Sequence, residues 1–235
     1  MILCDLPYEV LNKGNKHAQW DRLIPFNKLW EQYNRIIKDN GAIVLFAQGM
    51  FTAQLMMSNP KMWRYNLVWD KVLKNGFLNV NKMPLRRHED ICVFYKYLPQ
   101  YNPQMEKCEP HKRNHSRGNN VQQMKNSCYG QFVATPTHIT DEKFPTSIIS
   151  IPKEHKVGHF FHPTQKPIAL LEWLIKTYSN EGDTILDNCM GSGSTGVACI
   201  NTKRDFIGIE LNEEYFKIAK KRINAAIAEK QSRLF

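Results

Sequence analysis

The two ends of the chain alternate short apolar runs with amphipathic segments. Near the N-terminus the runs MILC (1–4) and GAIVLF (41–46) flank a segment from Phe26 to Ile37 in which apolar residues recur at three- and four-residue spacings. Such spacing predicts a helix, and a continuous apolar run is typical of a strand buried in a parallel sheet. The pattern therefore predicts a strand–helix–strand unit.

The same alternation returns in the last third of the chain. Helical spacing predicts one helix that begins at Pro167 and another that Asn212 caps and that extends to about Lys230. Between them, TILD (184–187) and FIGIE (206–210) are predicted strands. Strands that alternate with helices predict an α/β fold with a mostly parallel sheet and helices on both faces.

The middle of the chain has a different texture. One strand is predicted at Ile91–Tyr97, and the polar tract 101–130 that follows shows no sustained helical or strand period. A tract of this length is usually a functional loop or a small subdomain. We therefore expect 1–73 and 159–235 to be the two halves of one α/β domain, with an insertion over 74–158.

Composition fits a folded soluble protein, with 42% hydrophobic and 11% aromatic residues. The chain has no apolar stretch of the roughly 18 residues that a membrane span needs, and its first ten residues do not resemble a signal peptide. The six cysteines form no CxxC pair, which favours reduced thiols. We expect a cytoplasmic protein without a membrane partner.

Charge adds a candidate partner. The chain has 32 Lys and Arg against 22 Asp and Glu, a net charge of +10. An excess of this size indicates a polyanionic partner, of which nucleic acid is the simplest, although an indifferent basic surface is the alternative.

A glycine-rich turn, DNCMGSGSTG (187–196), connects a predicted strand to a predicted helix. Its glycines would let a nucleotide-type cofactor approach the backbone N–H groups at the helix N-terminus. Glu210 ends the next strand, where its carboxylate could accept hydrogen bonds from ribose hydroxyls. The turn lacks the lysine of a P-loop and departs from the GxGxxG of dehydrogenases. A purely structural turn is the alternative.

The loop Asp5-Leu6-Pro7-Tyr8 follows the first strand. Pro7 favours an extended Leu6, which could direct the Leu6 carbonyl outward beside the Asp5 carboxylate. Two such acceptors match the two hydrogens of an exocyclic amine, and Tyr8 offers a face on which a base could stack. A plain strand-to-turn exit is the alternative.

With these motifs the chain resembles the DNA amino-group methyltransferases, in the adenine-N6/cytosine-N4 branch whose catalytic tetrapeptide precedes the S-adenosylmethionine motif. The resemblance rests on DLPY (5–8), HPTQKP (162–167), DNCMGSGSTG (187–196) and FIGIELNEEYFKIAKKRI (206–223), which occur in the family's order. The chain is also similar to compact adenine methyltransferases of bacteria and phages. The resemblance implies a Rossmann-like methyltransferase sheet with an inserted target-recognition region.

The activity that the resemblance implies is methyl transfer from S-adenosylmethionine to the exocyclic N6 of an adenine flipped out of DNA. The implied catalytic residues are Asp5, Leu6, Pro7 and Tyr8. The implied cofactor-binding residues are His162, Thr164, Lys166, Asp187, Cys189, Gly191, Gly193, Thr195 and Glu210.

The chain departs from the family pattern at three places. Leu6 replaces the first proline of the tetrapeptide, and Asn188-Cys189 stands where the family usually has Pro-Phe. We expect the missing aromatic wall to come from elsewhere, with Phe160 and Phe161 as candidates. Family members also carry a longer segment before the tetrapeptide, so we expect a naturally short form or an internal start.

Basic and amide side chains make the insertion the candidate DNA-binding region, since cations contact phosphates and amides read base edges. The expected DNA contacts are Lys82, Arg86, Arg87, Lys112, Arg113, Arg117, Gln122 and Gln123. The spacing of Cys108, His111, His115 and Cys128 could hold zinc, but the polar tract around them suits a recognition loop and we expect no metal.

Three other functions stay open at this point. A cytosine-N4 methyltransferase would more often carry Ser at position 5, and a protein-glutamine methyltransferase would carry Asn there and need no basic surface. A DNA-binding relative that is catalytically impaired is the third. The resemblance also leaves open a homodimer and a cognate restriction nuclease as partners.

Overall fold

A computed structural model of the chain describes residues 1–9, 21–113, 123–126, 130–133, 138–153 and 165–232. The chain divides into two compact units. The main unit comprises Met1–Asn102 and Ser147–Phe235, and the small unit comprises Pro103–Thr146. Each unit is described by itself.

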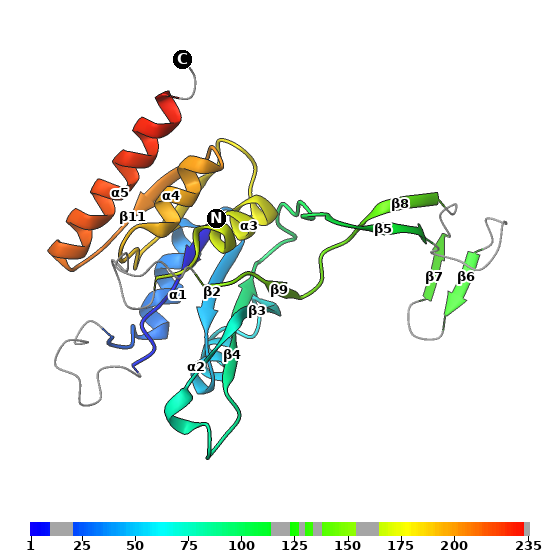
Figure 1. Ribbon diagram of the computed structural model, residues 1–235, viewed down its shortest axis with the longest axis horizontal. Helices are drawn as coiled ribbons and strands as arrows, with labels where there is room; N and C mark the ends of the chain where they lie inside the picture. The colour runs from blue at the N-terminus through cyan, green and yellow to red at the C-terminus, as the bar shows by residue number, and fades with distance from the viewer. Residues whose placement is uncertain (10–20, 114–122, 127–129, 134–137, 154–164, 233–235) are drawn as a thin grey trace. The chain divides into compact units, whose positions relative to one another are not determined.

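A seven-stranded sheet forms the centre of the main unit (Figure 1). From one edge to the other its strands are β11 (Asp205–Gly208), β10 (Thr184–Asp187), β1 (Ile2–Cys4), β2 (Ile43–Ala47), β4 (Arg86–Phe94), β3 (Trp63–Asn75) and β9 (Ile148–Ser150). The first four strands are mutually parallel. β4 is antiparallel to both β2 and β3, and β9 is parallel to β3.

Both faces of this sheet are buried, because alternate residues of each central strand belong to different cores. In β2, Ile43 and Leu45 pack with α1 (Phe26–Ile36) and α2 (Met50–Ser58). Val44 and Phe46 pack on the other side with α3 (Ile168–Tyr178) and α4 (Ser194–Asn201). The last helix, α5 (Glu213–Ser232), packs against α4. The predicted α/β fold with a mostly parallel sheet is confirmed.

Most of the predicted elements occur close to their expected bounds. Asn212 caps α5 as expected, since its side-chain oxygen accepts hydrogen bonds from the backbone N–H of Glu214 and of Tyr215, both at 3.0 Å. The strand predicted at Ile91–Tyr97 is β4, which starts five residues earlier, at Arg86, and ends at Phe94. β3 and α2 have no counterpart among the predicted elements.

The polar tract of the small unit contains strands that its sequence pattern does not indicate. β5 (Glu106–Arg113) pairs with β8 (His138–Lys143), and β6 (Gln123–Asn126) pairs with β7 (Gly130–Val133), both antiparallel. The small unit is shorter than the expected insertion 74–158, because β4 and β9 belong to the main sheet.

Among the described residues, none of the helices combines the length and the apolar character that crossing a membrane requires.

The glycine turn between β10 and α4 is fixed by backbone conformation and by close packing. Gly191 and Gly193 have φ values of 50° and 77°, in the left-handed region that favours glycine. A Cβ on Gly193 would lie 2.8 Å from the Cβ of Ala219 on α5. The turn therefore depends on a glycine at 193 for both reasons.

We predict that Gly193→Ala destabilises the protein more than Gly182→Ala. Gly182 also has a left-handed φ, 83°, but a Cβ there would meet nothing within 4 Å. Gly182→Ala should cost about 1–2 kcal/mol of unfolding free energy from backbone strain alone. Gly193→Ala should add about 1–3 kcal/mol from overpacking against α5. Urea unfolding of both variants measures the difference, and equal losses would show that α5 moves away at no cost.

Candidate active site

A cavity of about 860 Å³ opens at one edge of the main sheet. Its lining includes Asp5, Gln48 and Asn188, which directly follow β1, β2 and β10, and Glu210, two residues after β11. In open α/β sheets, ligands bind at this carboxyl edge of the strands. The volume lies within the range of roughly 300–1,000 Å³ that is usual for small-molecule sites.

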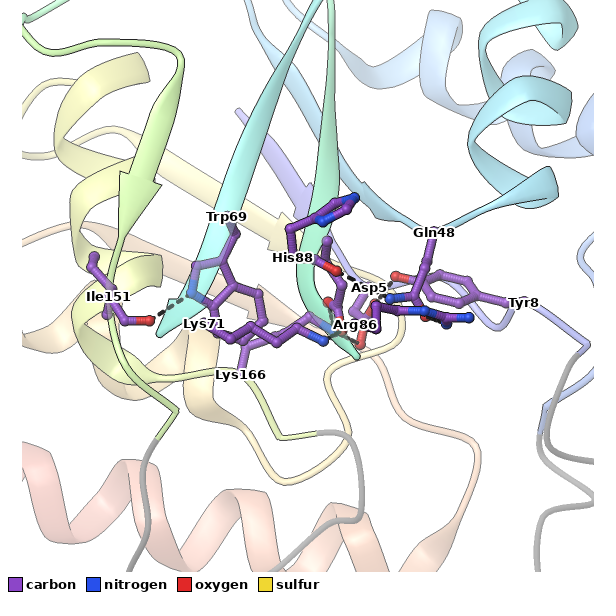
Figure 2. Close-up of polar contacts among 10 residues, drawn as sticks. Asp5, Tyr8, Gln48, Trp69, Lys71, Arg86, His88, Ile151 and Lys166 are labelled. Carbon is purple, nitrogen blue, oxygen red and sulfur yellow. Dashed lines mark hydrogen bonds and ion pairs between the residues drawn. The ribbon is translucent and has the colours of Figure 1, made fainter. Parts of the chain in front are cut away.

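The tetrapeptide Asp5-Leu6-Pro7-Tyr8 lines this cavity, and its first residue is held from two sides. Tyr8 donates its hydroxyl hydrogen to Oδ1 of Asp5 at 2.7 Å, and Lys166 Nζ donates to Oδ2 at 2.5 Å (Figure 2). The loop itself is fixed by Asp21, whose Oδ1 accepts from the backbone N–H of Tyr8 at 2.8 Å. The Asp5 carboxylate thus faces the cavity in a defined position.

Lys166 is the centre of a buried group of charges. Its ammonium lies 3.4 Å from Oε2 of Glu89 and over the ring of Phe46, 4.8 Å from the ring centroid. Glu89 also forms an ion pair with Lys71. Burial lowers the pKa of Lys166, but the Asp5 and Glu89 carboxylates outweigh this effect and leave the pKa raised. Lys166 therefore stays charged at neutral pH.

The same group of charges lowers the pKa of Glu89, whereas it raises the pKa of Lys166. Burial raises the pKa of Glu89, but the nearby charges of Lys166 and Lys71 outweigh it and leave the pKa lowered. Its Oε2 has no hydrogen-bond partner among the described residues, although Lys166 is within ion-pair range. Glu89 also lines the cavity, so this oxygen is an acceptor at the edge of the site.

Asp187 uses its carboxylate to shape the glycine turn. It accepts from the Thr195 hydroxyl at 2.6 Å and from the backbone N–H of Cys189 at 3.1 Å. Burial raises the pKa of Asp187 to about 6, and these two hydrogen bonds act against that rise. The residues expected to bind the cofactor here thus contact one another and line the cavity together.

Glu210 joins the end of β11 to the same turn. Its two carboxylate oxygens accept from the backbone N–H of Gly191 and of Asn212, both at 2.9 Å. A carboxylate offers about four acceptor positions, so Glu210 keeps capacity for the hydroxyls of a ribose. Glu210 lies in the cavity wall beside a turn that glycines keep open, and this donor and acceptor set fits the nucleoside part of S-adenosylmethionine.

The structure gives different positions to the remaining expected cofactor residues. Gly193 is not part of the cavity lining and packs against Ala219. Lys166 lines the cavity, but its ammonium pairs with Asp5 and Glu89. The candidates His162, Thr164, Phe160 and Phe161 lie outside the described residues.

The expected DNA contacts are spread over both units. In the main unit Lys82 is exposed, Arg86 lines the cavity and donates to Oε1 of Gln48 at 2.6 Å, and Arg87 is bidentate to Asp70 at 2.6 and 2.7 Å. Lys112 and Arg113 are on β5 and Gln123 is on β6 of the small unit. Arg117 and Gln122 lie outside the described residues, as do His115 and Cys128.

Several residues in or next to the cavity wall have no counterpart in the sequence predictions. Glu89 and Lys71 come from the antiparallel strands β4 and β3, and Tyr215 of α5 lines the cavity together with Asn212. The FIGIELNEEY motif contains Tyr215, so this residue could have been found as a replacement for the missing aromatic wall. Within the described residues no three His, Cys, Asp or Glu side chains gather in a group that could hold a metal ion.

Comparison with known sequences places this geometry in a family. The profile of the N6_N4_Mtase family, described as DNA methylase, matches residues 1–221. The type II methyltransferase M.HpaI of Haemophilus parainfluenzae is 27% identical over 233 residues, which are 96% of this chain and 68% of that protein. The DNA adenine methyltransferase YhdJ of Escherichia coli K12 is 40% identical over 93 residues, which are 39% of this chain and 32% of YhdJ.

Solved structures that resemble this chain are DNA methyltransferases as well. The M1.HpyAVI-SAM complex has a TM-score of 0.57 and 26% identity, and the match covers 94% of this chain and 87% of that one. The cytosine-N4-specific PvuII DNA methyltransferase has a TM-score of 0.62 at 13% identity, over 97% and 83% of the two chains, and shows a shared fold. The chain therefore belongs to the N6_N4_Mtase family of DNA methylases, which are S-adenosylmethionine-dependent methyltransferases, and the resemblance inferred from its four motifs is confirmed.

Proposed function

We propose that this protein transfers a methyl group from S-adenosylmethionine to the exocyclic N6 of an adenine that has been flipped out of DNA. The observation that carries the proposal is the Asp5 carboxylate, held by Tyr8 and Lys166 at the wall of a ligand-sized cavity. The relatives that are named as adenine methyltransferases support adenine as the target base.

The chemistry requires a better nucleophile than a free adenine amine, whose lone pair is conjugated with the ring. Hydrogen bonds from the two amino hydrogens to the Asp5 carboxylate and the Leu6 carbonyl would favour a tetrahedral nitrogen. The cofactor supplies an electrophilic methyl group on its sulfonium. Because the amine nitrogen must lose a proton, the Asp5 carboxylate is the group placed to receive it.

Lys166 acts as a positioning residue in this scheme. In the structure it occupies Oδ2 of Asp5 at 2.5 Å and has Glu89 as a second carboxylate at 3.4 Å. When the target amine donates to Asp5, Lys166 can keep a charged partner by shifting toward the unsatisfied Oε2 of Glu89. The buried ammonium is therefore never left without a counter-charge, which would be costly.

The cofactor would be held by the turn that follows β10 and by the end of β11. Glu210 would accept the ribose hydroxyls, with Gly191 and Cys189 beside it in the cavity lining. The aromatic ring of Tyr215 from α5 completes this side of the site.

DNA contact would involve the residues 74–158, which include the small unit. We assign phosphate contacts to Lys112, Arg113 and Arg117, and base-edge contacts to Gln122 and Gln123, because cations position a duplex and amides pair with adenine edges. We also propose that the protein forms a homodimer and acts alongside a cognate restriction nuclease. Its proposed location is the cytoplasm of a bacterium, with a bacterial or phage gene as its source.

The first test is direct. Incubation with isotopically labelled S-adenosylmethionine and DNA of mixed sequence, followed by nucleoside digestion, should yield N6-methyladenine as the labelled product. Labelled N4-methylcytosine would assign the protein to the cytosine enzymes of the family. Absence of any label in DNA would indicate a binding protein without turnover.

We predict that Asp5→Ala lowers the rate of methyl transfer by about 100-fold or more with little change in cofactor affinity. The carboxylate acts on the target amine in the transition state and does not hold the cofactor. Glu181→Ala is the matched control, because that carboxylate forms a surface ion pair with Lys203 at 3.1 Å. Single-turnover rates and calorimetric titration measure the two quantities, and a fully active Asp5→Ala variant would exclude the mechanism.

We predict that Glu210→Ala weakens S-adenosylmethionine binding by about one to two orders of magnitude. Loss of hydrogen bonds from the ribose to a charged acceptor costs roughly 1.5–3 kcal/mol. Glu210→Gln keeps the size of the side chain and one acceptor oxygen, so its cofactor affinity should lie between those of the unaltered protein and Glu210→Ala. Calorimetry on the folded variants decides, and unchanged affinity would place the cofactor elsewhere.

We predict different effects for the two kinds of side chain in the small unit. Lys112→Ala/Arg113→Ala should weaken binding to all DNA sequences and reduce the slope of log affinity against log salt by about one to two units. Gln123→Ala, or the same change at Gln122, should alter which sequences are methylated with little effect on that slope. If neither variant changes salt slope or sequence preference, the small unit does not contact DNA.

A further inference from the structure

The hairpin that connects β3 to β4 ends in a group of exposed apolar side chains. Phe77 is 76% exposed and Leu78 is 81% exposed, while Val80 and Met83 are each 56% exposed. We call these four residues the apolar tip. In Figure 1 this hairpin includes the short helical turn η1 (Phe77–Asn79) and extends beyond the ends of β3 and β4.

The backbone of the apolar tip forms a turn that is held by hydrogen bonds. Gly76, with φ of 91°, allows the chain to enter the turn, and its carbonyl accepts from the backbone N–H of Asn79 at 2.9 Å. The Asn79 carbonyl in turn accepts from the N–H of Lys82 at 2.9 Å and of Met83 at 3.0 Å. These backbone hydrogen bonds hold the turn while its apolar side chains are exposed to solvent. Exposed apolar patches of this kind mark interaction sites.

The exposed cations in the same hairpin favour a polyanion as the partner of the apolar tip. The hairpin segment 72–85 contains Lys74 and Lys82 and no Asp or Glu, whereas Lys71 and Arg87 at its base are paired with Glu89 and Asp70. Lys74, three residues before Phe77, and Lys82, between Val80 and Met83, are both exposed. Apolar side chains flanked by cations are the combination that proteins use to insert between base steps while they bind phosphates.

The base of the same hairpin belongs to the candidate active site. Trp69 of β3 and Arg86 and Glu89 of β4 line the cavity together with Asp5. Met83 lies three residues before Arg86, a span of about 10 Å at most in an extended chain. A base that enters the cavity would therefore leave its gap in the duplex close to the apolar tip.

From this placement we propose that the apolar tip is a wedge that enters the duplex beside the target base and fills the space left when that base flips out. The proposal rests on the proposed function, because base flipping requires the target to be bound in the cavity. Unstacking a base step costs a few kcal/mol, and an apolar side chain that occupies the gap offsets part of that cost.

The test compares a paired target with an unpaired one. The substrate is a short duplex that contains one methylation site mapped from the labelled product, and the second substrate carries an abasic position opposite the target adenine. For Phe77→Ala/Leu78→Ala in the full chain, kcat/KM on the paired duplex should fall at least about tenfold, which corresponds to about 1.4 kcal/mol. On the duplex with the abasic position it should change by less than about threefold, because the target there is not held by a pairing partner.

Met57→Ala is the matched control, since Met57 is 74% exposed on α2 and is not part of the hairpin. It should leave both rates unchanged. Equal losses on the two substrates, or no loss on either, would overturn the wedge. Loss of a dimer by the variant in size-exclusion chromatography, with unchanged rates, would assign the tip to self-association and also overturn it. Failure of the proposed function is distinguishable, because the unaltered protein would then methylate neither duplex.

Discussion

The buried ammonium of Lys166 is the interaction on which the arrangement of the site depends. It joins segments that are far apart in the chain, since it pairs with Asp5, 161 positions away, and with Glu89 of β4. Glu89 extends the group to Lys71 of β3. Charges of alternating sign hold one another in place at a depth where an unpaired charge would cost several kcal/mol. The position of the Asp5 carboxylate is thus set by strands on both sides of the cavity.

The buried Asp187 carboxylate that shapes the glycine turn lowers the stability of the folded protein. The pKa of Asp187 is raised to about 6 by burial, above the value of an unfolded chain. A carboxyl whose pKa is raised on folding destabilises the folded state as pH increases from the unfolded pKa toward the folded one, and this cost is fully present at neutral pH. The charged Asp187 still accepts hydrogen bonds from Thr195 and Cys189, which hold the turn in its conformation.

Sequence signals that are local could be predicted, and those that depend on strand register could not. DLPY, the glycine turn and Glu210 each follow an apolar strand, so their place at the carboxyl edge was predictable from the parallel pattern. Lys71 and Glu89 meet because Trp69 is paired with Glu89 across β3 and β4, a register that no local pattern indicates. β3 itself could have been predicted, because Trp63, Tyr65 and Leu67 alternate with the polar residues Arg64 and Asn66.

The antiparallel direction of β4 explains how a hairpin can stand at the mouth of the site. The last residue of β2, Ala47, is paired with Asp90, so the earlier residues of β4 from Arg86 onward extend past the carboxyl edge of the parallel strands. The connection between β3 and β4 therefore leaves the sheet at the edge where Asp5 and Glu210 lie. A parallel strand in the same place would begin at the opposite edge and direct its preceding loop away from the cavity. The antiparallel direction of β4 is thus what allows one connection to carry cations and apolar side chains on the edge of the sheet where the cavity lies.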